Sequence, residues 1–286
     1  MTSAVIPNYN GAKLLAQNLP KVLNNGIDEV IVVDDGSTDG SPQVLQKFKE
    51  VKVIRNDKNL GFVKSVNKGV KSAKGDIIVL LNSDVAPSKD FLKPVLPYFK
   101  NEKVFAVNFS EPQFSWAKAT FANGFIVHSP GPRGEAPRIS FWASGGSAAY
   151  SRQKWQELGG MDRLFHPFYW EDIDLSYRAA KRGWGIWWEP ASIVHHAHGG
   201  TIEKYFSKNY IEYISARNQL IFIWKNITSQ KMSAEHRKAL LKKLLQGQMI
   251  RPFFGALVKL PEIFAKRKNG ERFAKLTDEE IFAKFA

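Results

Sequence analysis

The chain has 286 residues, 44% of them hydrophobic, and a formal net charge of +14 at pH 7. This composition is typical of a globular protein with a sizeable core. The absence of cysteine excludes disulfides, thiolate metal sites and cysteine nucleophiles, so any bound metal must use oxygen or imidazole ligands. No apolar run approaches the length of about 18 residues typical of a membrane-spanning helix, and the first residues lack the features of a signal peptide. We therefore expect a cytoplasmic protein without a transmembrane anchor.

The first hundred residues alternate short β-branched runs with amphipathic stretches, as βαβ units do. Strands are predicted at 4–7, 29–34, 51–56 and 76–82. Apolar residues recur at helical spacing between these strands, within 14–23, 44–48 and 62–70. The pattern predicts a Rossmann-like sandwich with a parallel sheet.

Two of the predicted strands end in acidic residues. Asp34 and Asp35 close one of them, and Asp84 follows the other in the stretch Asn82-Ser83-Asp84. Ligands of open parallel sheets bind at the carboxyl ends of the strands, where oxygen ligands also suit Mg²⁺ or Mn²⁺ bound to phosphate. The alternative is that these acids only cap helices and close turns.

The middle of the chain is rich in glycine, proline and aromatic residues. Residues 113–139 predict a hairpin or flap, and 141–152 predict a loop of small residues that enters a short strand. Gly145 and Gly146 in this loop permit close backbone approach to a ligand, or they relieve a tight bend.

An acidic cluster, Glu171, Asp172 and Asp174, lies among aromatic residues at 168–178. Burial of unpaired charge is costly, so such acids are solvated, paired or kept for chemistry. Asp174 has the i, i+4 spacing for an ion pair with Arg178 on a helix that begins here. For Asp172, the structural alternative is a first-turn acid stabilised by the helix dipole.

Three histidines, His195, His196 and His198, follow a short apolar run. Three such residues within four positions suggest metal or phosphate binding. His128 and His166 have no matching motif, and we interpret them as structural.

Residues 202–286 are predicted to be helical and basic, with 17 Lys and Arg against 8 Asp and Glu, or +9 of the total +14. Leu240, Leu241, Leu244 and Leu245 form one helical stripe, and aromatic residues near further cations follow. This segment either packs on the core as a helical hairpin or contacts an anionic membrane surface. We favour membrane contact, with part of the stripe docked on the core.

Several stretches together resemble the family-2 glycosyltransferases, which are inverting enzymes of the GT-A fold. The stretches are VIPNYN at 5–10, VVDDGSTDGS at 32–41, NLGFVKSVNKG at 59–69, LLNSD at 80–84, GGMDRLFHPFYWEDIDLSYRAAKRGW at 159–184 and HHAHGGT at 195–201. The likeness covers about the first 225 residues and is strongest to the bacterial rhamnosyltransferase-like branch that builds cell-surface polysaccharides. It implies an α/β/α sandwich with a mixed, mostly parallel sheet. It also implies a nucleotide-diphosphate sugar donor and a glycan or polyprenyl-linked acceptor.

The resemblance also implies roles for residues at the strand ends. Pro7 and Tyr9 would lie beside the base of the donor nucleotide, and Asp35, with Asp34, would bind the base or ribose. Asn82-Ser83-Asp84 takes the place of the DxD motif, with Ser83 at the donor and Asp84 as the carboxylate ligand of Mg²⁺ or Mn²⁺. Because Asn82 replaces the first Asp, this site has one negative charge fewer and should hold its ion more weakly.

On the acceptor side, Glu171-Asp172 matches the ED motif, in which the Asp is the general base and the Glu orients it or touches the acceptor. Gly145 and Gly146 would border the acceptor pocket, and the rings of Tyr169 and Trp170 would suit stacking on a sugar. His196, or else His198, would complete the metal site.

These inferences divide the chain into a nucleotide-sugar-binding half (1–110), an acceptor-binding and catalytic half (111–201) and a helical basic tail (202–286), which would contact the inner face of the plasma membrane. A nucleotidyltransferase, or a non-catalytic protein that binds nucleotide sugars or glycans, remains the alternative. No nucleic-acid-binding motif is present, and neither dehydrogenase nor kinase glycine loops follow the first strands.

Overall fold

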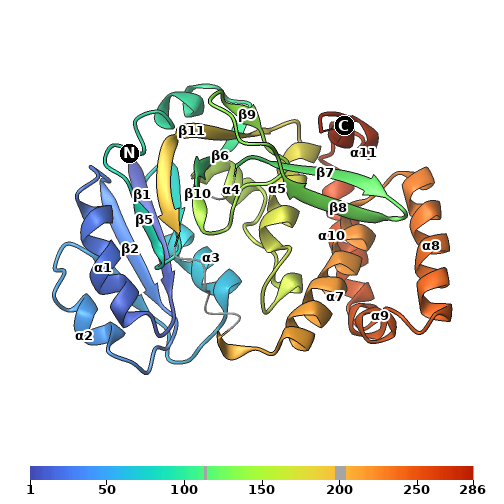
Figure 1. Cartoon of the computed structure of the whole chain (residues 1–286), viewed down its shortest axis with the longest axis horizontal. Helices are drawn as coiled ribbons and strands as arrows, with labels where there is room; N and C mark the ends of the chain where they lie inside the picture. The colour runs from blue at the N-terminus through green and yellow to red at the C-terminus, as the bar shows by residue number, and fades with distance from the viewer. Residues whose placement is uncertain (113–114, 197–203, 286) are drawn as a thin grey trace.

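The computed structural model describes residues 1–112, 115–196 and 204–285. A large twisted sheet crosses the molecule with helices on both faces, and further helices extend it at the C-terminal side (Figure 1). This arrangement confirms the predicted α/β sandwich and its helical C-terminal segment.

The large sheet has the strand order β3-β2-β1-β4-β10-β6-β11-β5, and β9 pairs with β11. Because β10 runs antiparallel to both of its neighbours, the sheet is mixed, while the other long strands share one direction. Its strands are β1 (Thr2–Asn8), β2 (Glu29–Asp34), β3 (Lys52–Arg55), β4 (Ile77–Leu81), β5 (Val85–Pro87), β6 (Val104–Ser110), β9 (Arg138–Ile139), β10 (Ser147–Ser151) and β11 (Gly185–His196).

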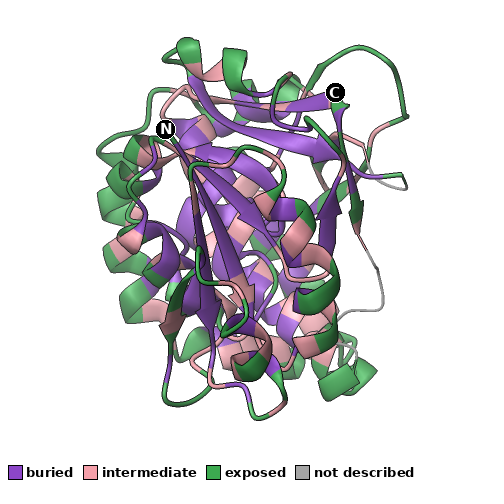
Figure 2. Cartoon of the chain, turned by 90° about the vertical axis from the view of Figure 1, so that its left-hand side faces the viewer, coloured by how far each residue is buried: buried purple, intermediate pink, exposed green. Residues whose placement is uncertain are grey.

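The central strands are buried on both faces, as Figure 2 shows. β4 has the sequence IIVLL and β2 the sequence EVIVVD, without alternation of polar and apolar residues. Continuous apolar runs are typical of parallel strands that are covered by helices on both sides. The four strands predicted for the first hundred residues are confirmed within two residues at each end.

The helices and turns that cover the sheet contribute two of the apolar cores, one on each face. Amphipathic α3 buries Val63, Val66 and Val70 against the strands. These elements are α1 (Ala12–Leu23), α2 (Ser41–Leu45), α3 (Phe62–Ser72), α4 (Arg152–Glu157) and α5 (Glu171–Lys181), with 3-10 turns η1 (Leu96–Lys100) and η2 (Arg163–Phe165).

A third apolar core joins the C-terminal helices to α5 and to a two-stranded sheet. That sheet is the hairpin of β7 (Ala117–Ala122) and β8 (Phe125–Pro130), which lies within the predicted hairpin segment. The helices are α7 (Lys208–Asn226), α8 (Gln230–Leu245), α9 (Ile250–Leu257), α10 (Leu260–Glu271) and α11 (Asp278–Ala283). Within the described ranges, no helix combines the length and the apolarity needed to cross a membrane.

Candidate active site

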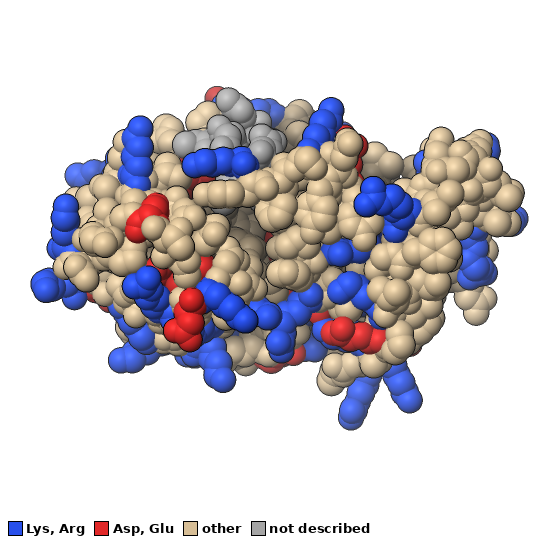
Figure 3. All heavy atoms as spheres, turned by 90° about the horizontal axis from the view of Figure 1, so that it is seen from below, with Lys and Arg blue, Asp and Glu red and all other residues tan. Residues whose placement is uncertain are grey.

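The predicted site residues gather where the parallel strands end. β1, β2, β4, β6 and β11 all point toward the lower side of Figure 1. The surface seen from that side is hollowed near its middle (Figure 3). The topology therefore brings residues that are far apart in the sequence to one face of the molecule.

Asp84 and His196 are brought together at this edge. The short strand β5 pairs antiparallel with the end of β11, so that His196 lies opposite Val85. Nε2 of His196 is 3.1 Å from Oδ1 of Asp84, and both side chains are mostly buried. The structure thus joins the predicted carboxylate and the preferred predicted histidine.

Glu111 is a third member of this cluster that sequence reasoning missed. It follows β6 directly, and its Oε2 is 3.2 Å from Nδ1 of His196, while its Oε1 accepts a hydrogen bond from Ser147. Burial lowers the pKa of His196, but the hydrogen bonds to Asp84 and Glu111 outweigh burial and raise that pKa to about 10. Glu111 shares the signal that singled out Asp34 and Asp84, an acid at the end of an apolar strand.

His195 does not join this cluster within the described part of the chain. Nε2 of His195 lies 3.3 Å from Oγ of Ser88, since alternate residues of a strand point to opposite faces. His198, the second predicted metal ligand, lies outside the described residues.

The side chains of Asp84 and His196 fit a divalent cation. They offer a carboxylate oxygen and an imidazole nitrogen, and Glu111 holds the opposite ring nitrogen, as carboxylates commonly do behind metal-binding histidines. Within 1–112, 115–196 and 204–285, no three His, Asp or Glu side chains are arranged to hold a metal ion. A cation here would therefore depend on further oxygens, such as those of a diphosphate.

Asp34 and Asp35 are both buried at the end of β2 and are used differently. The carboxylate of Asp35 accepts hydrogen bonds from the backbone N–H groups of Leu60 and Gly61, at 2.8 and 2.9 Å, and from the side chain of Asn56. Asp35 therefore fixes the loop that leads into α3. A contact of either acid with a nucleotide stays a prediction.

Asp34 has fewer partners. Its Oδ1 accepts a 3.3 Å hydrogen bond from Asn8, and its Oδ2 lies 3.7 Å from Nε of Arg55. Because its contacts are long, the buried carboxylate of Asp34 is better placed than that of Asp35 to accept a hydrogen bond from a further donor group.

Pro7 and Tyr9 lie at the end of β1, beside β2. Pro7 is opposite Val33 in the sheet, and the ring of Tyr9 lies 5.9 Å from that of Tyr205. Both residues are partly exposed. Their place at the carboxyl edge agrees with the predicted contact to a nucleotide base, which stays a prediction.

The bend at Gly145 and Gly146 connects the strand-end residues to the acidic cluster. The N–H of Asn82 donates to the carbonyl of Gly146 at 2.8 Å, and the N–H of Gly145 donates to Oδ2 of Asp172 at 3.2 Å. Ser83 follows Asn82, and its carbonyl accepts a hydrogen bond from the side chain of Asn18. Two consecutive residues thus touch both the predicted donor side and the predicted base.

Glu171 and Asp172 begin α5, as the sequence predicted. Oδ1 of Asp172 accepts the N–H of Ile173 at 2.8 Å, so both carboxylate oxygens of Asp172 bind backbone N–H groups. Glu171 is 7% exposed, whereas Asp172 is only partly buried. Asp172 is therefore the acid of this pair that a substrate can reach.

Burial raises the pKa of both acids. For Glu171, the charge of Asp172 raises the pKa further, while for Asp172 the backbone N–H groups of Ile173 and Gly145 oppose the rise. The backbone N–H groups thus favour the charged form of Asp172, whereas burial and the neighbouring charge disfavour the charged form of Glu171.

Tyr169 and Trp170 precede α5 with left-handed φ angles of 69° and 76°. Such a conformation costs roughly 1–2 kcal/mol for each residue other than glycine. Tyr169 is 37% exposed, but the buried ring of Trp170 packs against Phe222 and His128. Trp170 is thus a core residue, and we retain only Tyr169 for the predicted acceptor lining.

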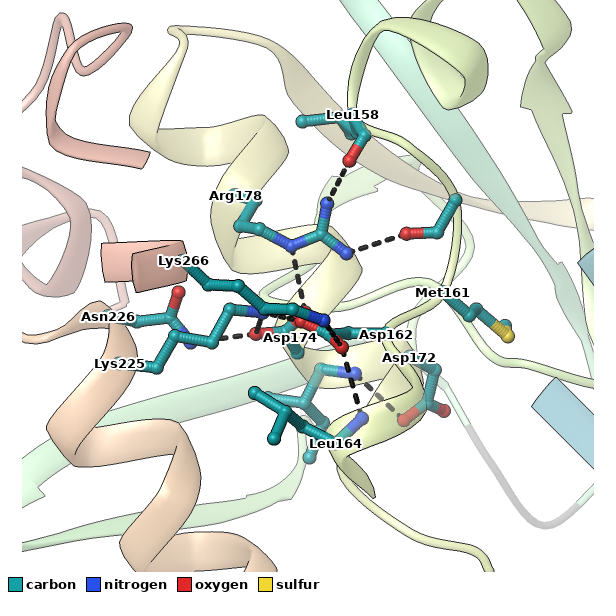
Figure 4. A network of polar contacts seen from close by, with 12 residues as sticks. Leu158, Met161, Asp162, Leu164, Asp172, Asp174, Arg178, Lys225, Asn226 and Lys266 are labelled. Carbon is teal, nitrogen blue, oxygen red and sulfur yellow. Dashed lines mark hydrogen bonds and ion pairs between the residues drawn. The ribbon is translucent and has the colours of Figure 1, made fainter. Parts of the chain in front are cut away.

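Asp174 anchors α5 to the C-terminal helices (Figure 4). The predicted pair with Arg178 is present at 2.8 Å, but Lys225 and Asn226 of α7 also bind the carboxylate, at 2.7 and 2.8 Å. Lys225 reaches Asp162 as well, at 2.6 Å. The sequence indicated the local pair and gave no sign of the contacts with α7.

Residues 3–159 match the model of a family described as Glycosyl transferase family 2. The chain is 27% identical over 241 residues to N-acetylgalactosaminyltransferase 7 of Drosophila melanogaster, covering 72% of this chain and 41% of that protein. It is 25% identical over 219 residues to the O-antigen chain rhamnosyltransferase RfbN of Salmonella typhimurium, covering 72% and 69% of the two chains.

Among solved structures, the chain is similar to GalNAc-T7 with UDP, GalNAc and Mn²⁺, with a TM-score of 0.64 and 15% identity over 84% of this chain and 54% of that one. This likeness confirms the predicted GT-A fold. The chain spans only about two fifths of the Drosophila relative.

Proposed function

The chain belongs to glycosyl transferase family 2, and on that premise we propose that it is an inverting glycosyltransferase with Asp172 as its general base. The observation that supports this most is the bend at Gly145 and Gly146, which touches Asp172 on one side and Asn82 on the other. The bend thereby links the proposed base to the strand end that carries Asp84, whose carboxylate contacts His196. Inverting transfer needs this arrangement, with a base opposite the departing diphosphate.

The proposed reaction is a direct displacement at the anomeric carbon of the donor sugar. Asp172 accepts the proton of the acceptor hydroxyl, the hydroxyl oxygen bonds to the anomeric carbon, and the bond from that carbon to the diphosphate oxygen breaks. The raised pKa of Asp172 makes it a stronger base, and the two N–H groups on its oxygens fix its orientation.

On the donor side, Pro7, Tyr9, Asp34 and Asp35 would bind the nucleoside, and Ser83 would lie along the diphosphate. Asp84 and His196 would hold Mg²⁺ or Mn²⁺, which would neutralise charge on the leaving diphosphate. The contacts of His196 with Asp84 and Glu111 support this assignment, as does the Mn²⁺ of the similar GalNAc-T7 structure.

A nucleotide-sugar panel tests the donor part of this proposal. Thermal shifts with UDP-, dTDP- and GDP-sugars, each with and without Mn²⁺, should show a metal-dependent rise in melting temperature for one class of base. In Asp84→Ala this metal dependence should be lost. A shift that is the same without metal, or in Asp84→Ala, would contradict the role of Asp84.

Transfer assays test the base. Asp172→Asn should keep the donor-induced thermal shift and lose about 10²–10⁴-fold in transfer rate, because the amide cannot accept the proton. The exposed Asp90→Asn is the matched control and should transfer normally. A normal rate in Asp172→Asn would exclude Asp172 as the base, and binding without transfer in the wild type would favour the non-catalytic alternative.

We also propose an acceptor of the cell surface, a glycan or polyprenyl-linked sugar, reached by contact of the C-terminal helices with an anionic membrane. The similarity to RfbN supports the acceptor class. Leu241 and Leu245 of α8 are exposed, as are Phe254 and Val258 at α9, and Lys242, Lys243 and Arg251 lie among them in the sequence. Leu240 of the same stripe is buried on the core.

The position of α9 supports this contact, because α9 lies on the same lower side of Figure 1 as the strand ends. Apolar side chains beside cations are typical of helices that lie in a membrane interface. A single membrane surface could then meet both the hollowed face and α9.

Vesicle sedimentation tests the membrane contact. Vesicles of phosphatidylcholine with phosphatidylserine should bind the protein, and Leu245→Ser/Val258→Ser should bind at least about tenfold more weakly, since two side chains lose their burial in lipid. Val53→Ser, at an exposed apolar position of β3, is the control and should bind normally. Equal binding of the double variant, or equal binding to phosphatidylcholine alone, would contradict the proposal.

A further inference from the structure

Residues 165–170 form a backbone bend that leads into Asp172 and includes two residues in an unfavourable conformation. Tyr169 and Trp170 are left-handed, and Trp170 provides no side-chain cap for α5. Such a bend persists only where surrounding structure fixes it. Because Asp172 is two residues from Trp170, this bend decides where the carboxylate lies.

Asn218 of α7 supplies that fixation. Its Nδ2 donates to the carbonyls of Phe165, Phe168 and Tyr169, each at 2.9 Å. The side chain is fully buried. One amide group therefore binds three carbonyls of the bend, including that of a left-handed residue.

Arg217 orients this amide. Its Nε and Nη2 donate to Oδ1 of Asn218 at 3.0 and 2.8 Å, and Nη2 also donates to the carbonyl of His166 at 2.5 Å. With Oδ1 bound to the guanidinium, the amide nitrogen must face the bend. Arg217 is itself 9% exposed, so water competes little for these bonds.

We propose that Asn218, oriented by Arg217, is a positioning residue for the general base, and that the C-terminal helix α7 is thereby part of the catalytic apparatus. This inference rests on the proposed role of Asp172. Asn218 lies 46 positions downstream of Asp172 and acts on it only through the 165–170 bend. Donor binding, at the strand ends, does not depend on it.

The closing experiment compares Asn218→Ala and Asn218→Asp with Gln219→Ala. Gln219 is a matched control, because it lies on the same helix and its Nε2 also donates to a carbonyl, that of Ile126 at 2.8 Å. We expect kcat to fall about 100-fold in the Asn218 variants, as misplacement of a reacting group by about 1 Å can cause. The donor KM and the thermal shift with UDP or GDP plus Mn²⁺ should stay within about twofold, as a role confined to the base requires.

Arg217→Lys is the second variant, in case Asn218 variants fold poorly. It keeps the charge but cannot bind Asn218 and His166 as the guanidinium does, so kcat should fall by a smaller factor. If kcat in Arg217→Lys and the Asn218 variants falls no further than in Gln219→Ala, or if donor affinity falls in step with kcat, the positioning role is overturned.

Hydrogen exchange separates this proposal from the proposed function. Amides of 165–174 should exchange faster in Asn218→Ala than in Gln219→Ala, whether or not the protein transfers sugar. A wild type without transferase activity would overturn the proposed function, while unchanged exchange in Asn218→Ala would overturn the role of Asn218 at the bend.

Discussion

Asp35, at the end of β2, and Asp174, in the first turn of α5, are both buried carboxylates with several polar partners. The partners of Asp35 come from residues 56–61 and include two backbone N–H groups. Asp174 instead binds Arg178 on its own helix and Lys225 and Asn226 of α7. The proposed donor side is thus built from neighbouring segments of the first half, whereas the helix that holds the proposed base depends on the C-terminal segment.

This difference bears on how the chain is divided. The predicted tail of residues 202–286 shares an apolar core with α5, and its Lys225 pairs with buried Asp174 of α5 and with Asp162. A segment with these contacts supports the catalytic half directly, besides any contact with a membrane. Substitutions in the tail should therefore disturb α5, whereas matched substitutions in the first half should not.

The largest expected effect is that of Lys225→Met. It removes the ammonium between Asp162 and Asp174 and leaves two buried carboxylates with fewer partners. The free energy of unfolding should fall by about 3–5 kcal/mol. Lys52→Met, which removes a 3.9 Å contact between the exposed Lys52 and Glu29, should cost less than about 1 kcal/mol. Urea denaturation measures both, and similar losses in the two variants would remove the contrast between the two regions.

The Gly145–Gly146 bend, where the two regions meet, gives the second comparison. A Cβ at Gly146 would lie 2.2 Å from Nδ2 of Asn82, while a Cβ at Gly145 would lie 3.5 Å from Cβ of Asp172. Gly146→Ala should therefore destabilise the fold by about 1–3 kcal/mol and weaken donor binding, because Asn82 must move. Gly145→Ala should change the stability of the fold and donor binding less than Gly146→Ala does. Equal stability and donor-induced thermal shifts for the two variants would contradict this.

The smallest expected effect is a change in acid sensitivity. Burial raises the pKa of Asp162, but Lys225 and Lys266 more than offset this and hold that pKa well below its usual range. Its stabilisation is therefore complete above the unfolded pKa of about 3.9 and is lost as the pH falls below that value. Asp162→Asn should be less stable at neutral pH.

Below about pH 4, the stability of Asp162→Asn should fall less steeply than that of the wild type, by up to about 1.4 kcal/mol per pH unit. Urea titrations at several pH values measure both slopes. Parallel curves for the two proteins would show that Asp162 does not contribute to acid unfolding.

Local patterns predicted the elements and residues of the first half well. The apolar runs indicated β1 to β4, and the acidic strand ends located Asp34, Asp35 and Asp84 at the carboxyl edge of the sheet. The i, i+4 rule gave the Asp174–Arg178 pair. Such features follow from residues close in the sequence, because strand ends and helical faces are set by local periodicity.

Other features could not be predicted from spacing. Glu111 contacts His196, 85 residues away in the sequence, and Asn218 contacts the 165–170 bend, about 50 residues away. Trp170 was predicted to line a sugar pocket, but its ring is buried against α7. No short sequence pattern indicates which distant side chains contact each other, because the packing of whole elements decides these contacts.

The sequence by itself determined the fold class, the family resemblance and the acids at the ends of β2, β4 and at the start of α5. Tertiary structure alone decided that His196 lies between Asp84 and Glu111, and that Glu171 is the more buried acid of its pair. It also decided that α7 binds the 165–170 bend, which precedes the proposed base Asp172. The physical reason is that charge and apolar periodicity act within one element, whereas burial, pKa and hydrogen-bond satisfaction arise only where elements meet.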